Sequence, residues 1–458
     1  RRLNLQEDTT SSIWNVDQFS LPYGDNLYGA HPHFVEIRNG KAHGVLLRNS
    51  NGQDWRLTKS GLNVVTIGGI IDLFVFAGPS VDEASRQYQA LVGTPWMPPY
   101  WSLGWQQCRY GFKDLSEIKN VYNEYMRQAI PLEVIYTDID YMHRWRNFTN
   151  DPINFELEDL REFVKTVHED DRRINIIVDP CIGEAKTGEY KAYDNGLEQD
   201  VFIKNVGGEV YRSRQWAGDV AILDPTAKNI KQYFTDELVQ WWSETGIQFD
   251  GIWLDMNEFA SFVDGEVNTT MPSDWFENHT VLWKYPAWVE DDTKRAKINA
   301  MTAQEVLDTD FEKEYRLTNG GNREYEDPLN NPPYHVHNCV AGIDSFSNVQ
   351  HEDTGFGISE LIWGKPEKPK PLTHKTFDMT ARFANGAQQY NMHNLYGIGM
   401  ARVVRAAAEA LPREGRPFML TRSTFSGSGS FCGTWNGDNV GNWEQYRSGV
   451  HAVIKAQV

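Results

Sequence analysis

Short apolar runs separated by turn-forming residues dominate the first part of the chain. The runs "HGVLLRNSNGQDW" and "LNVVTIGGIIDLFVFAG" are rich in β-branched residues and are broken by Asn-Gly and Gly-Gly pairs. This pattern is typical of short β-strands joined by tight turns. We expect a partial N-terminal β-sandwich domain over residues 1–92, set apart from the rest of the chain by the proline-rich stretch "GTPWMPPYW".

From residue 93 onward, apolar runs of strand length alternate with segments of helical periodicity. One helical segment begins at a capping box formed by Asp114 and Glu117, and apolar residues follow it three and four positions apart. The predicted strands lie in "SLGWQQC", "LEVIYTDID", "RINIIVDP", "FDGIWLDMNE", "RPFMLTRSTF" and "GTWNGDN". Strands that alternate with helices predict a parallel sheet, either open or closed into a barrel.

The regular alternation stops between about residues 262 and 390. This part contains "TNGGN", "NNPPY" and "PEKPKP", which are typical of turns and irregular backbone. We expect a long insertion after the fourth strand, because excursions of this length are usually functional loops or linkers.

Charged residues recur where the predicted strands end. Asp138, Asp179 and Asp255 close three successive strands, Arg422 follows the fifth and Asp438 follows the sixth. A single acid at such a position is more often a helix cap than a catalyst. Five charged residues in equivalent positions favour a shared site, since the carboxyl ends of barrel strands form one catalytic face. A pair of carboxylates there is what glycoside hydrolysis requires, although spacing alone does not identify the pair.

Composition narrows the classes of partner. A net charge of −19 argues against nucleic acid and anionic membranes as partners. No run approaches the ~18 consecutive apolar residues of a membrane span. The 16 tryptophans fit either large aromatic cores or a cleft in which rings stack on sugars. Composition leaves these two alternatives open.

Three sequons and four cysteines bear on the compartment. The sequons start at Asn147, Asn268 and Asn278, and together they favour glycosylation in a secretory pathway. We therefore expect a secreted or a vacuolar or lysosomal protein. The cysteines allow at most two disulfides, and their spacing decides neither pairing nor redox state. The chain opens with "RRLNLQ", which indicates a processed chain or a fragment.

The stretch "GIWLDMNEFASF" closely resembles the nucleophile motif of the α-glucosidases of glycoside hydrolase family 31. Other blocks resemble the family in the same order, namely "DNLYGAHP", "PPYWSLGWQQCRYGF", "TDIDYM", "HNLYG" and "LTRSTFSGSG" followed by "TWNGDN". The resemblance covers nearly the whole chain and implies a (β/α)8 TIM barrel, with about six strands present over residues 93–458. It also implies that a second chain or segment completes the barrel and supplies C-terminal β domains.

The resemblance assigns roles to individual residues. Asp255 matches the nucleophile and Asp438 matches the general acid/base, which implies a retaining reaction with carboxyl groups ~5–5.5 Å apart. The positions that match substrate-binding residues of the family are Asp138, Asp179, Trp216, Trp253, Met256, Arg422 and Trp435. We also expect the charge of Arg422 to keep Asp255 ionised.

The implied activity is that of an exo-acting α-glucosidase on maltose and maltooligosaccharides, with transglucosylation as a further activity. The alternatives are an α-xylosidase, a sucrase/isomaltase-type specificity, or a non-catalytic sugar-binding relative. We expect no cofactor and no metal. The group His335, His337 and Cys339 in "PYHVHNC" lies in the irregular insertion without a second cluster, so we do not predict a metal site there.

Overall fold

The computed structural model describes residues 9–17, 26–267, 327–330, 332, 334, 336, 372–439, 442–443, 445–447 and 449. Most of the expected insertion at 262–390 lies outside these residues. The sequons at Asn268 and Asn278 and the group around His335 lie outside them as well.

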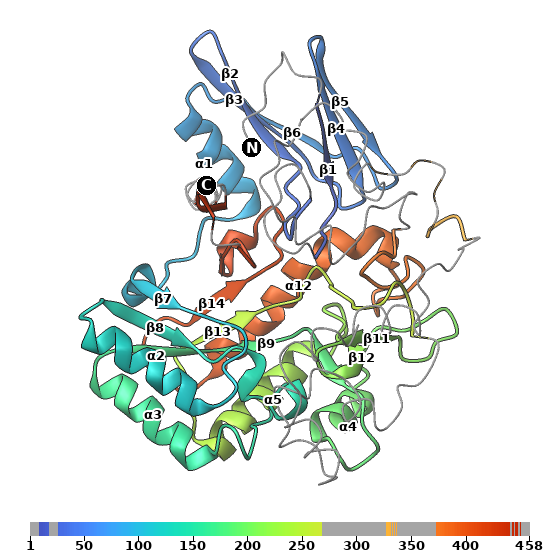
Figure 1. Ribbon diagram of the computed structural model, residues 1–458. Helices are drawn as coiled ribbons and strands as arrows, with labels where there is room; N and C mark the ends of the chain where they lie inside the picture. Colours follow the sequence, from blue (N-terminus) through green and yellow to red (C-terminus); the bar gives the residue numbers. More distant parts are fainter. Residues whose placement is uncertain are drawn as a thin grey trace.

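Within the described ranges, the larger part of the molecule is built on a curled sheet of six parallel strands (Figure 1). The strands are β7 (Trp105–Gln107), β8 (Leu132–Tyr136), β9 (Arg173–Val178), β13 (Gly251–Leu254), β14 (Phe418–Thr421) and β15 (Gly433–Thr434). They pair in chain order, each one parallel to its neighbour. All the predicted strands are therefore present, in the order that a (β/α) barrel requires.

Helices connect these strands and cover the outside of the sheet (Figure 1). They are α2 (Leu115–Arg127), α3 (Leu157–Glu169), α5 (Ile230–Thr245) and α12 (Gln389–Ala410). The predicted N-cap of α2 is present, because the Asp114 carboxylate accepts a hydrogen bond from the Glu117 amide at 3.0 Å. The Glu117 carboxylate accepts from the Lys113 amide at 3.1 Å and not from the Asp114 amide that a capping box uses. Helix α5 ends at Gly246, whose φ of 68° suits glycine.

The inner strands form the main hydrophobic core. Every residue of β13 is buried, as expected for a strand covered on both faces. At Gly251, a Cβ atom would lie 2.5 Å from Asn175 Oδ1 and 2.6 Å from a ring carbon of Phe418. Only glycine lets the neighbouring strands approach this closely at that position.

A small antiparallel sheet interrupts the barrel order between β9 and α5. It consists of β10 (Cys181–Gly183), β12 (Gly218–Ile222) and β11 (Arg212–Gln215), with α4 (Lys191–Glu198) beside it. We did not predict this sheet, because its strands are short and carry charged residues. Arg214 of β11 and Asp219 of β12 form a buried ion pair at 2.7 Å. Each charge is thus compensated by the other, although charged residues are unusual in a buried strand.

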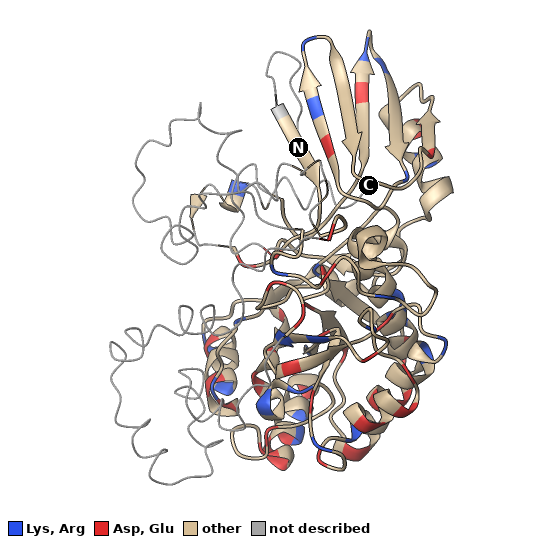
Figure 2. Ribbon diagram, turned by 90° about the vertical axis from the view of Figure 1, so that its right-hand side faces the viewer, with Lys and Arg blue, Asp and Glu red and all other residues tan. Residues whose placement is uncertain are grey.

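The N-terminal part forms two antiparallel sheets of three described strands each. One contains β1 (Thr9–Ile13), β4 (Gln53–Thr58) and β5 (Gly61–Thr66); the other contains β2 (His33–Arg38), β3 (Lys41–Leu47) and β6 (Leu73–Phe76). Helix α1 (Val81–Val92) packs on the second sheet through Ala84 and Tyr88. Figure 2 shows few charged residues on these sheets and many on the helices around the barrel.

Four short 3₁₀ turns are also described: η1 (Tyr100–Leu103), η2 (Ile139–Tyr141), η3 (His143–Trp145) and η5 (Ser428–Ser430). The described residues 443, 445–447 and 449 are α-helical. None of the described helices combines the length and apolar character that crossing a membrane requires.

Candidate active site

The charged residues at the strand ends do converge, and the register of the sheet explains why. Leu254 is paired with Val178 on one side and with Thr421 on the other. The next residues are Asp179, Asp255 and Arg422, so they lie side by side at one edge. The Asp255 amide donates to the Val178 carbonyl at 3.1 Å. The Arg422 amide donates to the Leu254 carbonyl at 3.1 Å.

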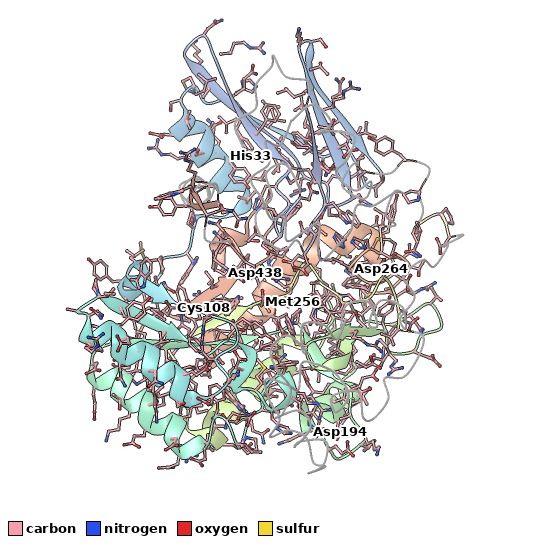
Figure 3. All side chains as sticks on the ribbon, in the orientation of Figure 1. His33, Cys108, Asp194, Met256, Asp264 and Asp438 are labelled. Atoms are coloured by element: carbon pink, nitrogen blue, oxygen red, sulfur yellow. The ribbon has the colours of Figure 1, made fainter. Side chains whose placement is uncertain are left out.

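Figure 3 places Cys108, Met256 and Asp438 at this same end of the sheet, below the N-terminal sheets. Electrostatic interactions of Asp438 with both Cys108 and Asp255 agree with this placement. The structure thus brings Asp438 and the strand-end residues to the same end of the sheet.

Arg422 lies at the centre of the site and is 4% exposed. Its Nε lies 3.2 Å from Asp255 Oδ1 and donates to Glu258 Oε1 at 3.0 Å. Its Nη2 donates to Glu258 Oε2 at 2.8 Å and lies 3.5 Å from Asp17 Oδ1. The guanidinium also lies over the Tyr28 ring, 4.7 Å from its centroid. One buried cation therefore holds three carboxylates together.

The two expected catalytic acids have raised pKa values. Burial raises the pKa of Asp255 well above its usual range, and the Arg422 charge opposes this shift. The charges of Asp179, Asp438 and Glu258 raise it further. Asp438 is more open to solvent, but the surrounding protein atoms still raise its pKa. A raised pKa suits Asp438 as an acid that has to donate a proton near neutral pH. It does not suit Asp255 as a nucleophile, so the opposing charge of Arg422 matters most at Asp255.

Asp179 is buried and has an unusually high pKa. Burial raises the pKa of its carboxyl to about 7, while Arg422 lowers it and Asp138 and Glu258 raise it. Its backbone is fixed by Asn147, which accepts from the Asp179 amide at 3.0 Å and donates to the Asp179 carbonyl at 2.7 Å.

The position of Asn147 contradicts one expectation. The side chain is 2% exposed, and its amide nitrogen also donates to the Cys181 carbonyl at 2.9 Å. A glycan on this nitrogen leaves it one N–H, which cannot donate to both the Asp179 and the Cys181 carbonyl. The buried position also has no room for a sugar. Asn147 is therefore a structural residue beside Asp179 and is removed from the expected glycosylation sites.

Two strand-end residues have backbone conformations that are rare outside glycine. Asp138 has φ 55° and Met256 has φ 53°. Strain of this kind is often found at functional sites. The Asp138 Oδ1 accepts from the Ile139 amide at 2.7 Å, and its Oδ2 lies 3.8 Å from the Cys108 sulfur.

Predicted aromatic residues precede the two acids in the sequence, Trp253 before Asp255 and Trp435 before Asp438. Trp253 packs edge-on against Trp435, with ring centroids 5.1 Å apart. Its buried indole nitrogen has no hydrogen-bond partner within the described residues, so it is available as a donor. Trp216 lies at the turn between β11 and β12. Its ring centroid is 4.8 Å from that of Phe262 and 5.5 Å from that of Tyr110. The antiparallel sheet thus brings the predicted Trp216 to the barrel.

Several functional neighbours were missed from the sequence. Glu258 belongs to the recognised motif, yet its bidentate contact with Arg422 was not foreseen. Asp17 and Tyr28 lie in the N-terminal part, which the sequence predicts as a separate domain. A signal was available for Tyr28 in the block "DNLYGAHP", whose resemblance to the family is as clear as that of the barrel motifs.

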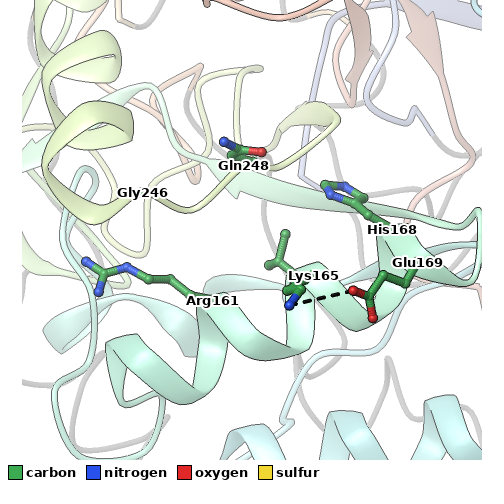
Figure 4. Close-up of a pocket in the computed structure, with 7 residues that line it drawn as sticks. Arg161, Lys165, His168, Glu169, Gly246 and Gln248 are labelled. Atoms are coloured by element: carbon green, nitrogen blue, oxygen red, sulfur yellow. Dashed lines mark ion pairs between the residues drawn. The ribbon is translucent and has the colours of Figure 1, made fainter.

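A groove at the other end of the barrel does not belong to this site. It has a volume of about 440 Å³ and is lined by residues of α3 and of the segment before β13, including Arg161, Lys165 and His168 (Figure 4). Its polar groups already have partners: Lys165 pairs with Glu169 at 3.6 Å and His168 with Asp250 at 2.9 Å. Among the described residues, no group of three or more His, Cys, Asp or Glu is arranged to hold a metal ion.

Comparison with known families identifies the class of protein. Residues 95–458 match the glycosyl hydrolases family 31 TIM-barrel domain, and residues 2–54 match the glycosyl hydrolase 31 N-terminal galactose mutarotase-like domain. The chain therefore belongs to glycoside hydrolase family 31, and the predicted barrel with an N-terminal β-rich part is confirmed.

Individual relatives agree with this assignment. The chain is 33% identical over 449 residues to a probable alpha/beta-glucosidase of Aspergillus flavus, covering 96% of this chain and 47% of that protein. It is 32% identical over 453 residues to an alpha-glucosidase of Mucor javanicus, covering 98% of this chain and 46% of the relative. The chain thus spans about half the length of the curated relatives it matches.

Solved structures show the same fold. The alpha subunit of glucosidase II superposes with a TM-score of 0.65 at 19% identity, covering 95% of this chain and 37% of that one. A family 31 alpha-glucosidase of Bacteroides thetaiotaomicron superposes with a TM-score of 0.61 at 22% identity, covering 96% and 54%.

Proposed function

We propose that the protein is a retaining exo-α-glucosidase that releases glucose from the non-reducing ends of maltose and α-1,4-linked maltooligosaccharides. The observation that carries this proposal is the position of two acids at one end of the sheet: Asp255 follows β13 and lies 3.2 Å from Arg422, and Asp438 follows β15. The names of the relatives, alpha-glucosidase and alpha/beta-glucosidase, support the choice of sugar.

The reaction takes two displacements at C1 of the terminal glucose. Asp255 attacks C1 while Asp438 gives its proton to the departing glycosidic oxygen, so the C1–O bond breaks as the ester to Asp255 forms. Asp438, now ionised, takes a proton from water, which attacks C1 and releases Asp255. The product keeps the α configuration. A sugar hydroxyl in place of water gives transglucosylation.

The other residues of the site have supporting roles. Arg422 stabilises the ionised form of Asp255 against the effect of burial. Asp138 and Asp179 accept hydrogen bonds from glucose hydroxyls. Trp253, Met256 and Trp435 cover the apolar face of the sugar, and Trp216 extends this aromatic wall.

Proton NMR of maltose incubated with the purified protein at mildly acidic pH tests the proposal, with any co-purifying chain left in place. Early accumulation of α-glucose from the non-reducing end is the expected result. The Asp255→Asn and Asp438→Asn variants should lose this activity while they keep the far-UV circular dichroism of the parent. Early β-glucose would overturn the retaining α mechanism.

A substrate panel distinguishes the remaining specificities. It contains maltose, isomaltose, sucrose and the p-nitrophenyl α-glucoside, β-glucoside and α-xyloside. We expect maltose and the α-glucoside to be cleaved fastest. Faster cleavage of the xyloside, or of isomaltose or sucrose, would replace the proposed specificity. Binding of maltose by calorimetry without turnover of any substrate would indicate a sugar-binding relative.

We also propose that a further polypeptide segment with two strand–helix units completes the barrel. Within the described residues, β7 and β15 each pair on one side only. Leu103, just before β7, and Trp105, the first residue of β7, are exposed. Eight strands close a barrel of this type. Trp105→Asp should weaken association with a separate polypeptide that supplies the two missing strand–helix units. Ile153→Asp, at an exposed position in the segment before α3, is the control. Unchanged association of the Trp105→Asp variant would contradict binding of the completing segment beside β7.

The two remaining sequons, at Asn268 and Asn278, and the acidic composition support a secretory-pathway location, either secreted or vacuolar or lysosomal. Mapping of glycopeptides from the natural source tests this. Unmodified asparagine at both positions would contradict it.

A further inference from the structure

The segment that carries Asp17 is anchored on the barrel. The ring of Trp14 stacks on His393 of α12 with centroids 3.8 Å apart, and His393 Nε2 bonds to the Asn15 carbonyl at 2.7 Å. The Asn15 amide donates to Asn394 Oδ1 at 2.9 Å. These contacts bring Asp17 to within 3.5 Å of Arg422, so an N-terminal residue reaches the centre of the site.

Lys375 is the second cation beside Asp17. Its Nζ donates to the Asp17 carbonyl at 3.1 Å and lies 4.0 Å from the Asp17 Oδ2. The side chain of Lys375 is 10% exposed. The two carboxylate oxygens of Asp17 therefore face different cations, Oδ1 towards Arg422 and Oδ2 towards Lys375.

The backbone of Lys375 is fixed by the loop that follows β13. The Lys375 carbonyl accepts from the Ser261 amide at 2.8 Å, and the Lys375 amide donates to Asp264 Oδ1 at 2.8 Å. The same loop carries Glu258, the bidentate partner of Arg422. Lys375 thus connects the loop after β13 to the N-terminal segment at the point where both meet Arg422.

We propose that Lys375 is a positioning residue, which holds Asp17 against Arg422 and so maintains the orientation of the guanidinium towards Asp255. It does not touch the reacting atoms. The kinetic part of this inference rests on the glucosidase activity proposed above, whereas the geometric part does not.

Charge balance supports this role. Arg422 faces the carboxylates of Asp17, Asp255 and Glu258. A buried cation and its partners are sensitive to the removal of any member of the network. Without Lys375, the Oδ2 and the carbonyl of Asp17 lose their cationic partner, and Asp17 is free to turn away from Arg422. The guanidinium then moves towards the acids that remain.

The kinetic test compares Lys375→Met, Lys375→Arg and Asp17→Asn in the full chain with any completing chain present. We expect Lys375→Met to lower kcat about 5- to 50-fold with KM changed less than about threefold, and Asp17→Asn to behave alike. The double variant should be no slower than the slower single variant. Lys375→Arg should recover most of the loss. Lys204→Met is the control, since Lys204 forms a surface pair with Asp200.

Several results would overturn the proposal. They are an unchanged kcat for Lys375→Met per folded molecule, no recovery in Lys375→Arg, or fully multiplicative effects in the double variant. A variant that fails to fold is recognised by circular dichroism, and the cycle is then measured with Lys375→Gln.

A labelling test does not depend on activity. An N-hydroxysuccinimide ester should acetylate Lys375 at least about tenfold more slowly than Lys204, because Lys375 is more buried and is engaged with Asp17. Asp17→Asn should accelerate the labelling of Lys375 and leave that of Lys204 unchanged. If no glucoside is hydrolysed but this pattern is found, the proposed function fails and the geometric link stands. If Lys375 is labelled as fast as Lys204, the link itself is wrong.

Discussion

Arg422 and Glu258 form a bidentate ion pair, with Nε to Oε1 at 3.0 Å and Nη2 to Oε2 at 2.8 Å. Both side chains are buried, and the same Nε lies 3.2 Å from Asp255. Glu258 therefore shares the cation whose charge opposes the effect of burial on the pKa of Asp255. The two acids affect each other through Arg422, and opposite substitutions should move the pKa of Asp255 in opposite directions.

Replacing Arg422 with Met should raise the pKa of Asp255, because the charge that opposes burial is lost. The proposed nucleophile has to be ionised, so the acidic limb of the kcat/KM profile should move to higher pH by about 1–3 units. We expect kcat to fall about 100- to 1,000-fold as well. Arg422→Lys, which keeps the charge, should show a smaller shift. An unchanged acidic limb with undiminished turnover would contradict the role of Arg422.

Replacing Glu258 with Gln should have the opposite effect on the profile. The Glu258 charge raises the pKa of Asp255, and its removal also leaves Arg422 free to pair more fully with Asp255. The acidic limb should therefore move to lower pH, even if turnover falls. A pH series of kcat/KM on a p-nitrophenyl α-glucoside measures this. A shift in the same direction as that of Arg422→Met would show that Glu258 acts only by holding Arg422 in place.

Local patterns were enough to predict the parallel strands and the acids at their ends. A strand-length apolar run ends where a charged residue must leave the core, and parallel register then brings Asp179 and Asp255 together. Contacts that join distant segments were not predictable in this way. The approach of Asp17 to Arg422 depends on how the N-terminal segment packs on α12, and no local spacing encodes that packing.

Asp179 should make the stability of the fold depend on pH. Its pKa of about 7 in the folded protein exceeds the ordinary value of 3.8, so the folded state binds more protons between about pH 4 and 7. Stability therefore falls as the pH rises through this window. Asp179→Asn should gain on the order of 2–4 kcal/mol at pH 7 relative to the parent, and far less at pH 4. Urea denaturation at both pH values measures this, and parallel changes at the two pH values would contradict it.

Cys108 should report on the occupancy of the site. It forms no disulfide, and its sulfur lies 3.8 Å from Asp138 Oδ2. The surrounding protein atoms, and then the charges of Asp138 and Asp255, raise the pKa of the thiol well above its usual range. Iodoacetamide should therefore react slowly at pH 7 and faster as the pH rises above about 9.

Alkylation of Cys108 should abolish glucosidase activity, because the adduct lies beside the Asp138 carboxylate. Glucose should protect the thiol, and Cys108→Ser should make the enzyme insensitive to the reagent. Cys181 and Cys432 are buried and should react only after unfolding. Inactivation of the Cys108→Ser variant at the same rate would show that another group is responsible.

Substitution of the buried Asn147 tests how the backbone of Asp179 is held in place. Asn147 makes three hydrogen bonds to the backbone of Asp179 and Cys181, so Asn147→Ala should destabilise the fold by about 2–5 kcal/mol. Thr149→Ser is the matched control, because it keeps the sequon and a hydroxyl that can bond to the Arg146 carbonyl.

Protein made in a secretory host should carry no glycan at Asn147 when peptides are mapped after deglycosylation in heavy-oxygen water. Heavy oxygen at this position in correctly folded, active protein would mean that the amide is not bound to the strand ends. The anchoring of Asp179 by Asn147 would then be wrong as well.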